Sequence, residues 1–258
     1  MTNLNYSVGI VTYKYRFEKW FKPLLNQIKE FRPDIEIMVA VNGENNEEFD
    51  QQFRNNILEF ISQKENTYVN MYPTFRGLCK MWNNLMINAS NHKMLLLNDD
   101  ITIRSPLFFD ELENKFEQGW SDPRLDIFKI NGSWSHCFAD RRTIDKIGWF
   151  DERFLSMGEE DGDVEWRIGD LTEGGQIMSI QLPDIDNHVE QENCLVGMDK
   201  VNLKYAKFNL DFAYGYKYQV DNVNGKSYGL QPRKLICINP SPPLHTSEKF
   251  YWSNRDKL

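Results

Sequence analysis

The sequence MLLLNDD (residues 94–100) places a short apolar run directly before two adjacent carboxylates. An apolar run of this length that stops at polar residues is typical of a strand buried on both faces. Three further strands are predicted before it, at 6–12, 36–41 and 67–72, and helical segments separate them. Strands that alternate with helices form a parallel sheet with right-handed crossovers, so we expect an α/β fold.

The helices between these strands are predicted from apolar residues that recur at helical spacing. Pro23 lies inside the first helical pattern, so that helix either begins near Pro23 or bends there. After Asp100 the pattern is less regular. The predicted helices are 20–31, 49–61, 78–86, 140–147 and 161–171, and the later strands are 126–130 and 176–182.

The composition of the chain favours one large cytoplasmic domain. Its 258 residues are 41% hydrophobic, which is enough for a sizeable core. A formal charge of −8 argues against a nucleic-acid partner, because such a surface needs clustered Lys and Arg. We expect no membrane span and no signal peptide, and the scattered cysteines lack the close spacing of a metal or redox pair.

Polar residues follow each of the four predicted parallel strands. Thr12 and Tyr13 close the first strand, Asn42 and Gly43 the second, and residues 72–76 the third. The fourth ends in Asn98-Asp99-Asp100. Because ligands of open α/β sheets bind at the carboxyl ends of the strands, these residues predict a binding site at one edge of the sheet.

The pair Asp99-Asp100 is a candidate metal site. Two adjacent carboxylates at the end of a buried strand repel each other and lose hydration unless they share a cation. Oxygen ligands suit Mg²⁺ or Mn²⁺, which keep open positions for substrate phosphates. A polar turn that closes the strand explains an isolated Asn-Asp-Asp more simply, so this motif does not decide the chemistry by itself.

A second acidic group, GEEDGD, occupies residues 158–163 and precedes the last predicted helix. Carboxylates at a helix start stabilise the positive end of the helix dipole, which is one explanation of the group. A carboxylate held near other acids also has a raised pKa, which suits a general base. His188, after a predicted strand, is a candidate metal ligand, whereas His136 could line an acceptor pocket or be packed.

The order of these features resembles the GT-A-fold glycosyltransferases, and most closely the family-2 inverting enzymes. The resemblance implies a Rossmann-like, mostly parallel central sheet flanked by helices. It spans residues 7–188, and its most specific part is residues 148–167. The matching segments are SVGIVTY (7–13), EIMVAVNGENN (36–46), RGLCKMWN (76–83), LLLNDD (95–100) and GWFDERFLSMGEEDGDVEWR (148–167).

The resemblance implies that one half of the domain, residues 1–100, binds a nucleotide-sugar donor, with UDP as the default nucleotide. Thr12 and Tyr13 would hold the base, with Tyr13 stacked on it, and Asn42 would reach the base edge. Arg76 would lie near the ribose or the diphosphate, and Asp99 would contact the ribose.

The resemblance also implies a metal ion and a catalytic base. Asp100 and His188 would bind Mn²⁺ or Mg²⁺, and Asn98 stands where the family usually has the first acid of its D-x-D motif. Asp161 would take a proton from the acceptor hydroxyl. Residues 101–190 would form the acceptor and catalytic half, in which the candidate acceptor or supporting residues are Trp134, His136, Glu160 and Asp163.

The expected acceptor is a glycan or a lipid-linked saccharide, as in polysaccharide biosynthesis. Residues 191–258 resemble no known family and are expected to form an irregular extension packed on the same domain. Phe250, Tyr251 and Trp252 are predicted to be exposed there and to allow peripheral docking on the inner face of a membrane.

Two other functions remain open from the sequence. A sugar nucleotidyltransferase would show a Gly-rich basic loop after the first strand, and residues 13–16 are basic but lack glycine. A non-catalytic carbohydrate-binding protein would lack one of the two acidic groups, and both are present.

Overall fold

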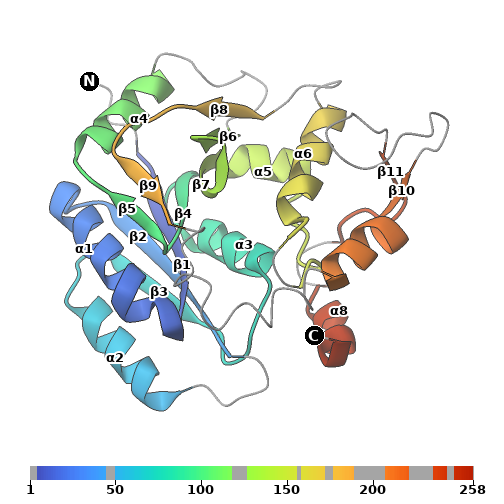
Figure 1. The fold of residues 1–258 in the computed structure, drawn as a ribbon, viewed down its shortest axis with the longest axis horizontal. Coiled ribbons are helices and arrows are strands. Elements are labelled where there is room, and N and C mark those ends of the chain that lie inside the picture. The colour runs from blue at the N-terminus through green and yellow to red at the C-terminus, as the bar shows by residue number, and fades with distance from the viewer. Residues whose placement is uncertain are drawn as a thin grey trace.

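The computed structural model describes residues 5–44, 50–117, 127–155, 158–171, 177–188, 207–220, 235–242 and 247–257. Its centre is a seven-stranded sheet with the strand order β3-β2-β1-β4-β7-β6-β8 (Figure 1). The strands are β1 (Ser7–Tyr13), β2 (Glu36–Asn42), β3 (Thr67–Met71), β4 (Lys93–Asn98), β6 (Ile127–Ile130), β7 (Ser133–Asp140) and β8 (Met178–Ile180).

The first four strands of the sheet are parallel, as the sequence predicts. β1 lies between β2 and β4, and β3 pairs with β2. The sheet turns antiparallel only at β7, which pairs with β4, and at β6, which pairs with β7. The register places Tyr13 beside Asn42 and Val11 beside Asn98, so the polar ends of β1, β2 and β4 meet at one edge.

Helices cover both faces of the sheet, so each face needs its own apolar side chains. Leu95 and Leu97 of β4 pack in one core and Leu96 packs in the other, which confirms a strand buried on both faces. The first core holds α1 (Lys22–Phe31), α2 (Gln51–Ser62) and α4 (Leu107–Glu117); the second holds α3 (Leu78–Asn88), α5 (Arg141–Ile147) and α6 (Glu160–Leu171).

The first helix begins near Pro23, one of the two predicted alternatives. α1 carries Pro23 in its first turn, where the missing N–H costs no hydrogen bond. A 3₁₀ turn at Lys14–Arg16 and a π-helical turn at Phe17–Phe21 lead into it. These irregular turns bring Arg16 back over the carboxyl end of β1.

Four elements before residue 190 were not predicted: β5 (Ile101–Ile103), α4, β7 and β9 (Ile185–Asn187). β5 and β9 form a separate two-stranded antiparallel sheet, and a strand of three residues is too short to show a period. The first part of β7 is half-buried and polar, and only residues 136–140 are buried, which hides the strand in the sequence.

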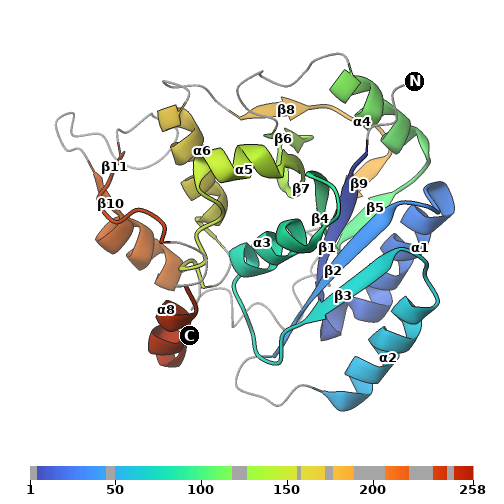
Figure 2. The ribbon, with the colours of Figure 1, turned by 180° about the vertical axis from the view of Figure 1, so that it is seen from behind.

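The described part of the C-terminal segment contains regular elements. They are a helical stretch at residues 207–212, a π-helical turn at Ala213–Lys217, the antiparallel pair β10 (Tyr218–Val220) and β11 (Leu235–Cys237), and α8 (Ser247–Asn254). Figure 2 shows them beside α6, away from α1 and α2. Phe212 and Ala213 belong to the same core as α3 and α6. Residues 191–206 and 221–234 lie outside the described part, and a division near residue 190 stays a prediction.

One surface expectation is wrong. Tyr251 is buried and Phe250 is half-buried, because both pack against Leu155 and Phe75, and only Trp252 is exposed. The aromatic patch proposed for membrane docking is therefore a single tryptophan. No helix in the described ranges is long and apolar enough to cross a membrane.

Candidate functional site

The carboxyl ends of β1 and β4 bring together a compact charged cluster. The Thr12 hydroxyl donates to Asp99 Oδ2 at 2.7 Å, and Arg16 Nη1 donates to Asp99 Oδ1 at 2.8 Å. Arg16 Nη1 also lies 3.0 Å from Asp100 Oδ2. All four side chains are buried. One guanidinium thus faces two carboxylates, and the cluster keeps a net negative charge.

Burial sets the protonation of Asp99. Desolvation raises the pKa of its carboxyl to about 6, although the charge of Arg16 acts in the opposite direction. Asp99 is therefore mostly ionised at neutral pH, with both oxygens held as hydrogen-bond acceptors. A fixed, ionised carboxylate at this place suits recognition of hydroxyl groups.

Asp100 and Asn98 present oxygens with no hydrogen-bond donor in the described part of the chain. Neither carboxylate oxygen of Asp100 accepts a hydrogen bond, and the contact of Oδ2 with Arg16 is an ion pair only. Asn98 Oδ1 is likewise buried and unpartnered. Buried oxygens of this kind are costly unless a cation or a ligand completes them, so the donor set fits Mn²⁺ or Mg²⁺.

The protein supplies few ligands for such an ion. No group of three or more His, Cys, Asp or Glu side chains in the described ranges could hold a metal. An ion bound at Asp100 would take most of its ligands from a phosphate-bearing substrate and water, which is the usual arrangement for Mg²⁺.

His188 lies directly beside this cluster, as expected. Its backbone N–H donates to the Asp100 carbonyl at 2.9 Å, so the end of β9 is attached to the end of β4. Its Nε2 lies 2.9 Å from Thr102 Oγ1, and its ring stacks on Trp20 at 4.8 Å between centroids. In this rotamer Nε2 is engaged by Thr102, and the predicted role as a metal ligand stays a prediction.

Tyr13 stands at the rim of the cluster with its ring partly open. The Arg16 guanidinium lies 5.5 Å from the ring centroid, and Tyr15 packs edge-on at 6.2 Å. Burial raises the pKa of the Tyr13 hydroxyl, so the ring is neutral. Its position agrees with a stacking role, which no contact in the structure tests.

Asn42 has a structural partner that the sequence did not predict. Its Nδ2 donates to the Arg76 carbonyl at 2.9 Å, and its Oδ1 accepts from the Arg76 N–H at 2.8 Å. Both ends of the amide are thus used to fix the chain before α3. The predicted contact of Asn42 with a nucleotide base is not tested here.

The Arg76 side chain lies under α8. Its guanidinium is 3.7 Å from the Tyr251 ring centroid, and Nη2 is 3.2 Å from Glu248 Oε2. Lys80 Nζ lies 3.2 Å from Glu248 Oε1 and 3.0 Å from Glu152 Oε2. Two cations and two carboxylates therefore alternate at the start of α3, where phosphate oxygens could replace the exposed Glu248.

The second acidic group opens α6, and its members have distinct surroundings. Asp161 is half-buried, and its Oδ1 accepts from the Gly162 N–H at 2.8 Å. Glu160 is buried, its Oε2 has no hydrogen-bond partner, and desolvation raises the pKa of its carboxyl to about 8. Glu160 is therefore mostly protonated at neutral pH. Asp161 remains the predicted base.

Asp163 links α6 to the C-terminal segment. Its Oδ2 pairs with Arg167 at 2.7 Å, and its Oδ1 pairs with the fully buried Lys217 at 2.5 Å. The Tyr218 hydroxyl donates to the same Oδ1 at 2.5 Å. Lys217 also reaches Asp151 Oδ2 at 2.6 Å. Two acids from the most specific motif are thus anchors for the C-terminal segment.

Trp134 and His136 lie on β7, and both were candidates for the acceptor side. Trp134 is half-buried, and its Nε1 donates to Glu165 Oε1 at 2.9 Å. His136 is buried beside Leu97, and burial lowers its pKa to about 4, so its ring is neutral. Packing in the sheet, one of the two alternatives for His136, is what the structure shows.

Sequence reasoning missed Arg16, Glu248 and Lys217. Arg16 was noted only as part of a basic loop, and its place six residues before the start of α1 gave no sign that it turns back toward β4. Glu248 and Lys217 lie in the segment without recognisable motifs. No local pattern points to either of them, because their partners are distant along the chain.

No protein-family model matches the sequence, and no curated protein sequence matches it. Solved structures do match. The structure of TarS from S. aureus matches 78% of this chain at 17% identity, with a TM-score of 0.51. The mannosyltransferase PcManGT from Pyrobaculum calidifontis, in complex with GDP-Man and Mn²⁺, matches 70% at 13% identity, with a TM-score of 0.52. Both are GT-A-type glycosyltransferases. The chain has the GT-A fold.

The chain spans 39% of the TarS chain and 56% of the mannosyltransferase chain. At these identities the likeness establishes the GT-A fold, and the activity has to be argued from the site. The predicted fold is confirmed, whereas membership of the family-2 group stays a prediction.

Proposed function

We propose that the protein is an inverting glycosyltransferase. It would transfer a sugar from a nucleoside diphosphate sugar, with UDP as the default nucleotide, to a hydroxyl of a glycan or lipid-linked acceptor. One observation carries this proposal: Asp99 is fixed by Thr12 and Arg16, while the buried carboxylate oxygens of the neighbouring Asp100 accept no hydrogen bond in the described part of the chain. Both lie at the edge of a GT-A sheet where ligands bind.

The donor would bind across the carboxyl ends of β1, β2 and β4. Tyr13 would stack on the base, Asp99 would accept from the ribose, and Arg76 would approach the diphosphate after exchanging its partner Glu248. Asp100 and His188 would hold Mn²⁺ or Mg²⁺, which offsets the charge on the departing nucleoside diphosphate when bound. The partially exposed ring of Tyr13 and the unpartnered oxygen of Asp100 support these roles.

Asp161 would act as the base. The acceptor oxygen would form a bond to the anomeric carbon while the bond from that carbon to the diphosphate breaks, and Asp161 would take the hydroxyl proton. The single displacement inverts the anomeric configuration. The partial exposure of Asp161 supports this role, because an acceptor hydroxyl can approach its carboxylate.

A thermal-shift panel together with an assay of sugar transfer tests the proposal. UDP-, dTDP- and GDP-sugars are added with and without Mn²⁺ to the wild type, to Asp100→Ala and to Asp161→Asn. We expect one donor to stabilise the wild type only with Mn²⁺, and this shift to disappear in Asp100→Ala. Asp161→Asn should keep the shift and lose transfer by at least a hundredfold. An unchanged shift in Asp100→Ala removes the metal assignment, and normal turnover of Asp161→Asn removes the base.

The same panel, extended with nucleoside triphosphates and a sugar 1-phosphate, separates the two alternatives. A sugar nucleotidyltransferase would be stabilised by a nucleoside triphosphate together with a sugar 1-phosphate. In the structure Arg16 is turned onto Asp99 and Asp100, which leaves the loop after β1 without a free arginine for a triphosphate. A non-catalytic carbohydrate-binding protein would show no metal-dependent donor shift at all.

A further inference from the structure

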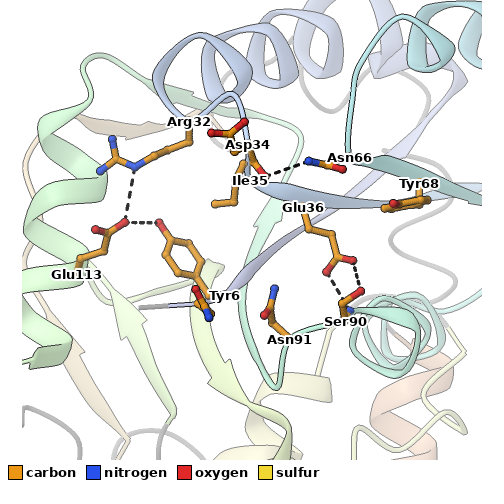
Figure 3. A pocket seen from close by; sticks show the side chains of 11 residues that line it. Tyr6, Arg32, Asp34, Ile35, Glu36, Asn66, Tyr68, Ser90, Asn91 and Glu113 are labelled. Carbon is orange, nitrogen blue, oxygen red and sulfur yellow. Dashed lines mark hydrogen bonds and ion pairs between the residues drawn. The ribbon is translucent and has the colours of Figure 1, made fainter. Parts of the chain in front are cut away.

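A hollow of about 630 Å³ lies at the edge of the sheet where the parallel strands begin, opposite the carboxyl ends that carry the candidate site (Figure 3). Its walls come from the residues just before β1, the starts of β2 and β3, the loops that lead into β2, β3 and β4, and helix α4. Since GT-A donors bind at the carboxyl ends, this hollow is outside the proposed reaction site. Its volume is in the range of ligand-binding pockets.

The charges of the hollow argue against an anionic ligand. Arg32 is already paired, with Nη2 at 2.5 Å from Asp110 Oδ1 and Nε at 3.6 Å from Glu113 Oε1. Asp34 and Glu36 line the same space and add negative charge. A phosphate or a nucleotide would therefore meet repulsion and no free cation among these lining residues.

The polar groups of the hollow are fixed in place by their neighbours. Glu36 accepts from the Ser90 N–H at 2.9 Å and from the Ser90 hydroxyl at 2.6 Å. On the opposite side the Tyr6 hydroxyl donates to Glu113 at 3.2 Å. Figure 3 shows these two pairs facing each other across the hollow. Carboxylates with remaining lone pairs, next to amides and hydroxyls, match a ligand with many hydroxyl groups.

An aromatic ring stands at the rim of the hollow. Tyr68 lies on the edge strand β3 and is 53% exposed, so it has room for a flat partner. The apolar face of a sugar ring packs on such an aromatic face while the sugar hydroxyls reach polar groups at its edges. An exposed ring beside fixed carboxylates and amides is the combination that a neutral saccharide needs.

We infer that this hollow binds a neutral oligosaccharide segment of the acceptor, remote from the transfer site. The inference rests on the proposed glycosyl transfer for its biological meaning, although binding can be measured without it. β1 runs from the hollow to the transfer edge, and its length at about 3.3 Å per residue separates the two by about 20 Å. Only an acceptor several sugar units long would span both sites, and the second contact would raise its effective concentration.

Direct binding tests the site without an enzyme assay. Maltohexaose, cellohexaose and chitohexaose are titrated into the full chain by calorimetry, and hexagalacturonate serves as the anionic probe. We expect at least one neutral hexasaccharide to bind, Tyr68→Ala to weaken it at least tenfold, and Tyr68→Phe to retain it. Tyr216→Ala, which removes another exposed tyrosine far from the hollow, should bind as the wild type does.

Asp100→Ala should bind the hexasaccharide normally, so failure of the metal site and failure of this site are distinguishable. Absence of binding by all three neutral probes overturns the inference. Unchanged affinity in Tyr68→Ala overturns the location, and tighter binding of hexagalacturonate overturns the neutral class.

Discussion

Arg16 offsets part of the negative charge of the candidate site, because one guanidinium faces both Asp99 and Asp100. All three groups are buried, and removal of one partner from a buried ion pair leaves the other charge uncompensated. Arg16 therefore supplies positive charge to the two carboxylates, and a metal ion bound at Asp100 would supply more.

The first prediction is that Mn²⁺ can take over the charge compensation that Arg16 provides. Arg16→Met should lower the free energy of unfolding by about 3–5 kcal/mol, because Asp99 and Asp100 lose their cation. Mn²⁺ should then stabilise the variant more than it stabilises the wild type, as measured by the shift in Tm. Lys19→Met, which removes an exposed cation nearby, should behave as the wild type. An equal Mn²⁺-induced shift in the Tm of Arg16→Met and of the wild type would contradict the idea that Arg16 and the metal ion compensate the same carboxylates.

The second prediction concerns pH and Glu160. Desolvation raises the pKa of its carboxyl to about 8 in the folded state, from 4.5 when free, so the folded chain binds this proton more tightly. Its contribution to stability is present below pH 4.5 and is lost as pH rises through 8. At pH 9 the free energy of unfolding of Glu160→Gln, measured by urea denaturation, should therefore exceed that of the wild type by on the order of 2–4 kcal/mol. At pH 5 the two proteins should differ little.

The exposed Glu59→Gln is the matched control for that experiment, because its charge change occurs in water. A constant difference between Glu160→Gln and the wild type at both pH values would mean that Glu160 is ionised in the folded protein.

At the scale of elements, α8 and α3 share one cluster of charges. Glu248 of α8 pairs with Arg76 and Lys80 before and within α3, and Asn83 of α3 donates to Glu152 at 3.1 Å. The start of α3 thus joins the loop before α6 to the C-terminal helix. A donor diphosphate at Arg76 would have to displace Glu248.

The third prediction follows from this competition. Glu248→Gln should tighten binding of the donor or its nucleoside diphosphate about two- to fivefold, measured by calorimetry with Mn²⁺ present. The gain is modest because the Glu248 side chain is 41% exposed, and exposed ion pairs contribute about 1 kcal/mol or less. Glu18→Gln, which breaks an exposed ion pair with Lys22, should leave the affinity unchanged. Weaker binding in Glu248→Gln would place Arg76 outside the diphosphate site.

Elements with a strong local period were predictable, and those held by distant partners were not. β4 was identified because it is a short apolar run that stops at polar residues, and the structure shows its side chains divided between two cores. The carboxyl edge followed from the parallel order. β5, β9 and β7 exist through pairing with strands far along the chain. In the candidate site the same holds, since Asp99 and Asp100 directly follow an apolar run, whereas Arg16 reaches them only through two irregular turns.

At the scale of the whole molecule, Lys217 joins the C-terminal segment to the GT-A sheet. It is fully buried and pairs with Asp151, in the loop after α5, and with Asp163, in the first turns of α6. Two hydrogen-bonded carboxylates around one ammonium make the buried charge tolerable. Lys217 of the C-terminal segment therefore compensates the buried charge of Asp163 in α6. We expect the C-terminal segment and the sheet with its helices to unfold together.

The fourth prediction tests that cooperativity. Lys217→Met removes one cation from the buried Asp151 and Asp163, which keep only Arg153 and Arg167. It should cost about 3–5 kcal/mol, seen as one calorimetric transition at a lower Tm. Lys207→Met, which removes an exposed ion pair with Asp211 in the same segment, should change Tm little. A separate transition of the C-terminal segment at lower temperature, with the main Tm unchanged, would show that the sheet and its helices are stable without that segment. In that case Asp163 would be free to serve the acceptor side, as the sequence allowed, and its pairing with Lys217 would be incidental to the fold.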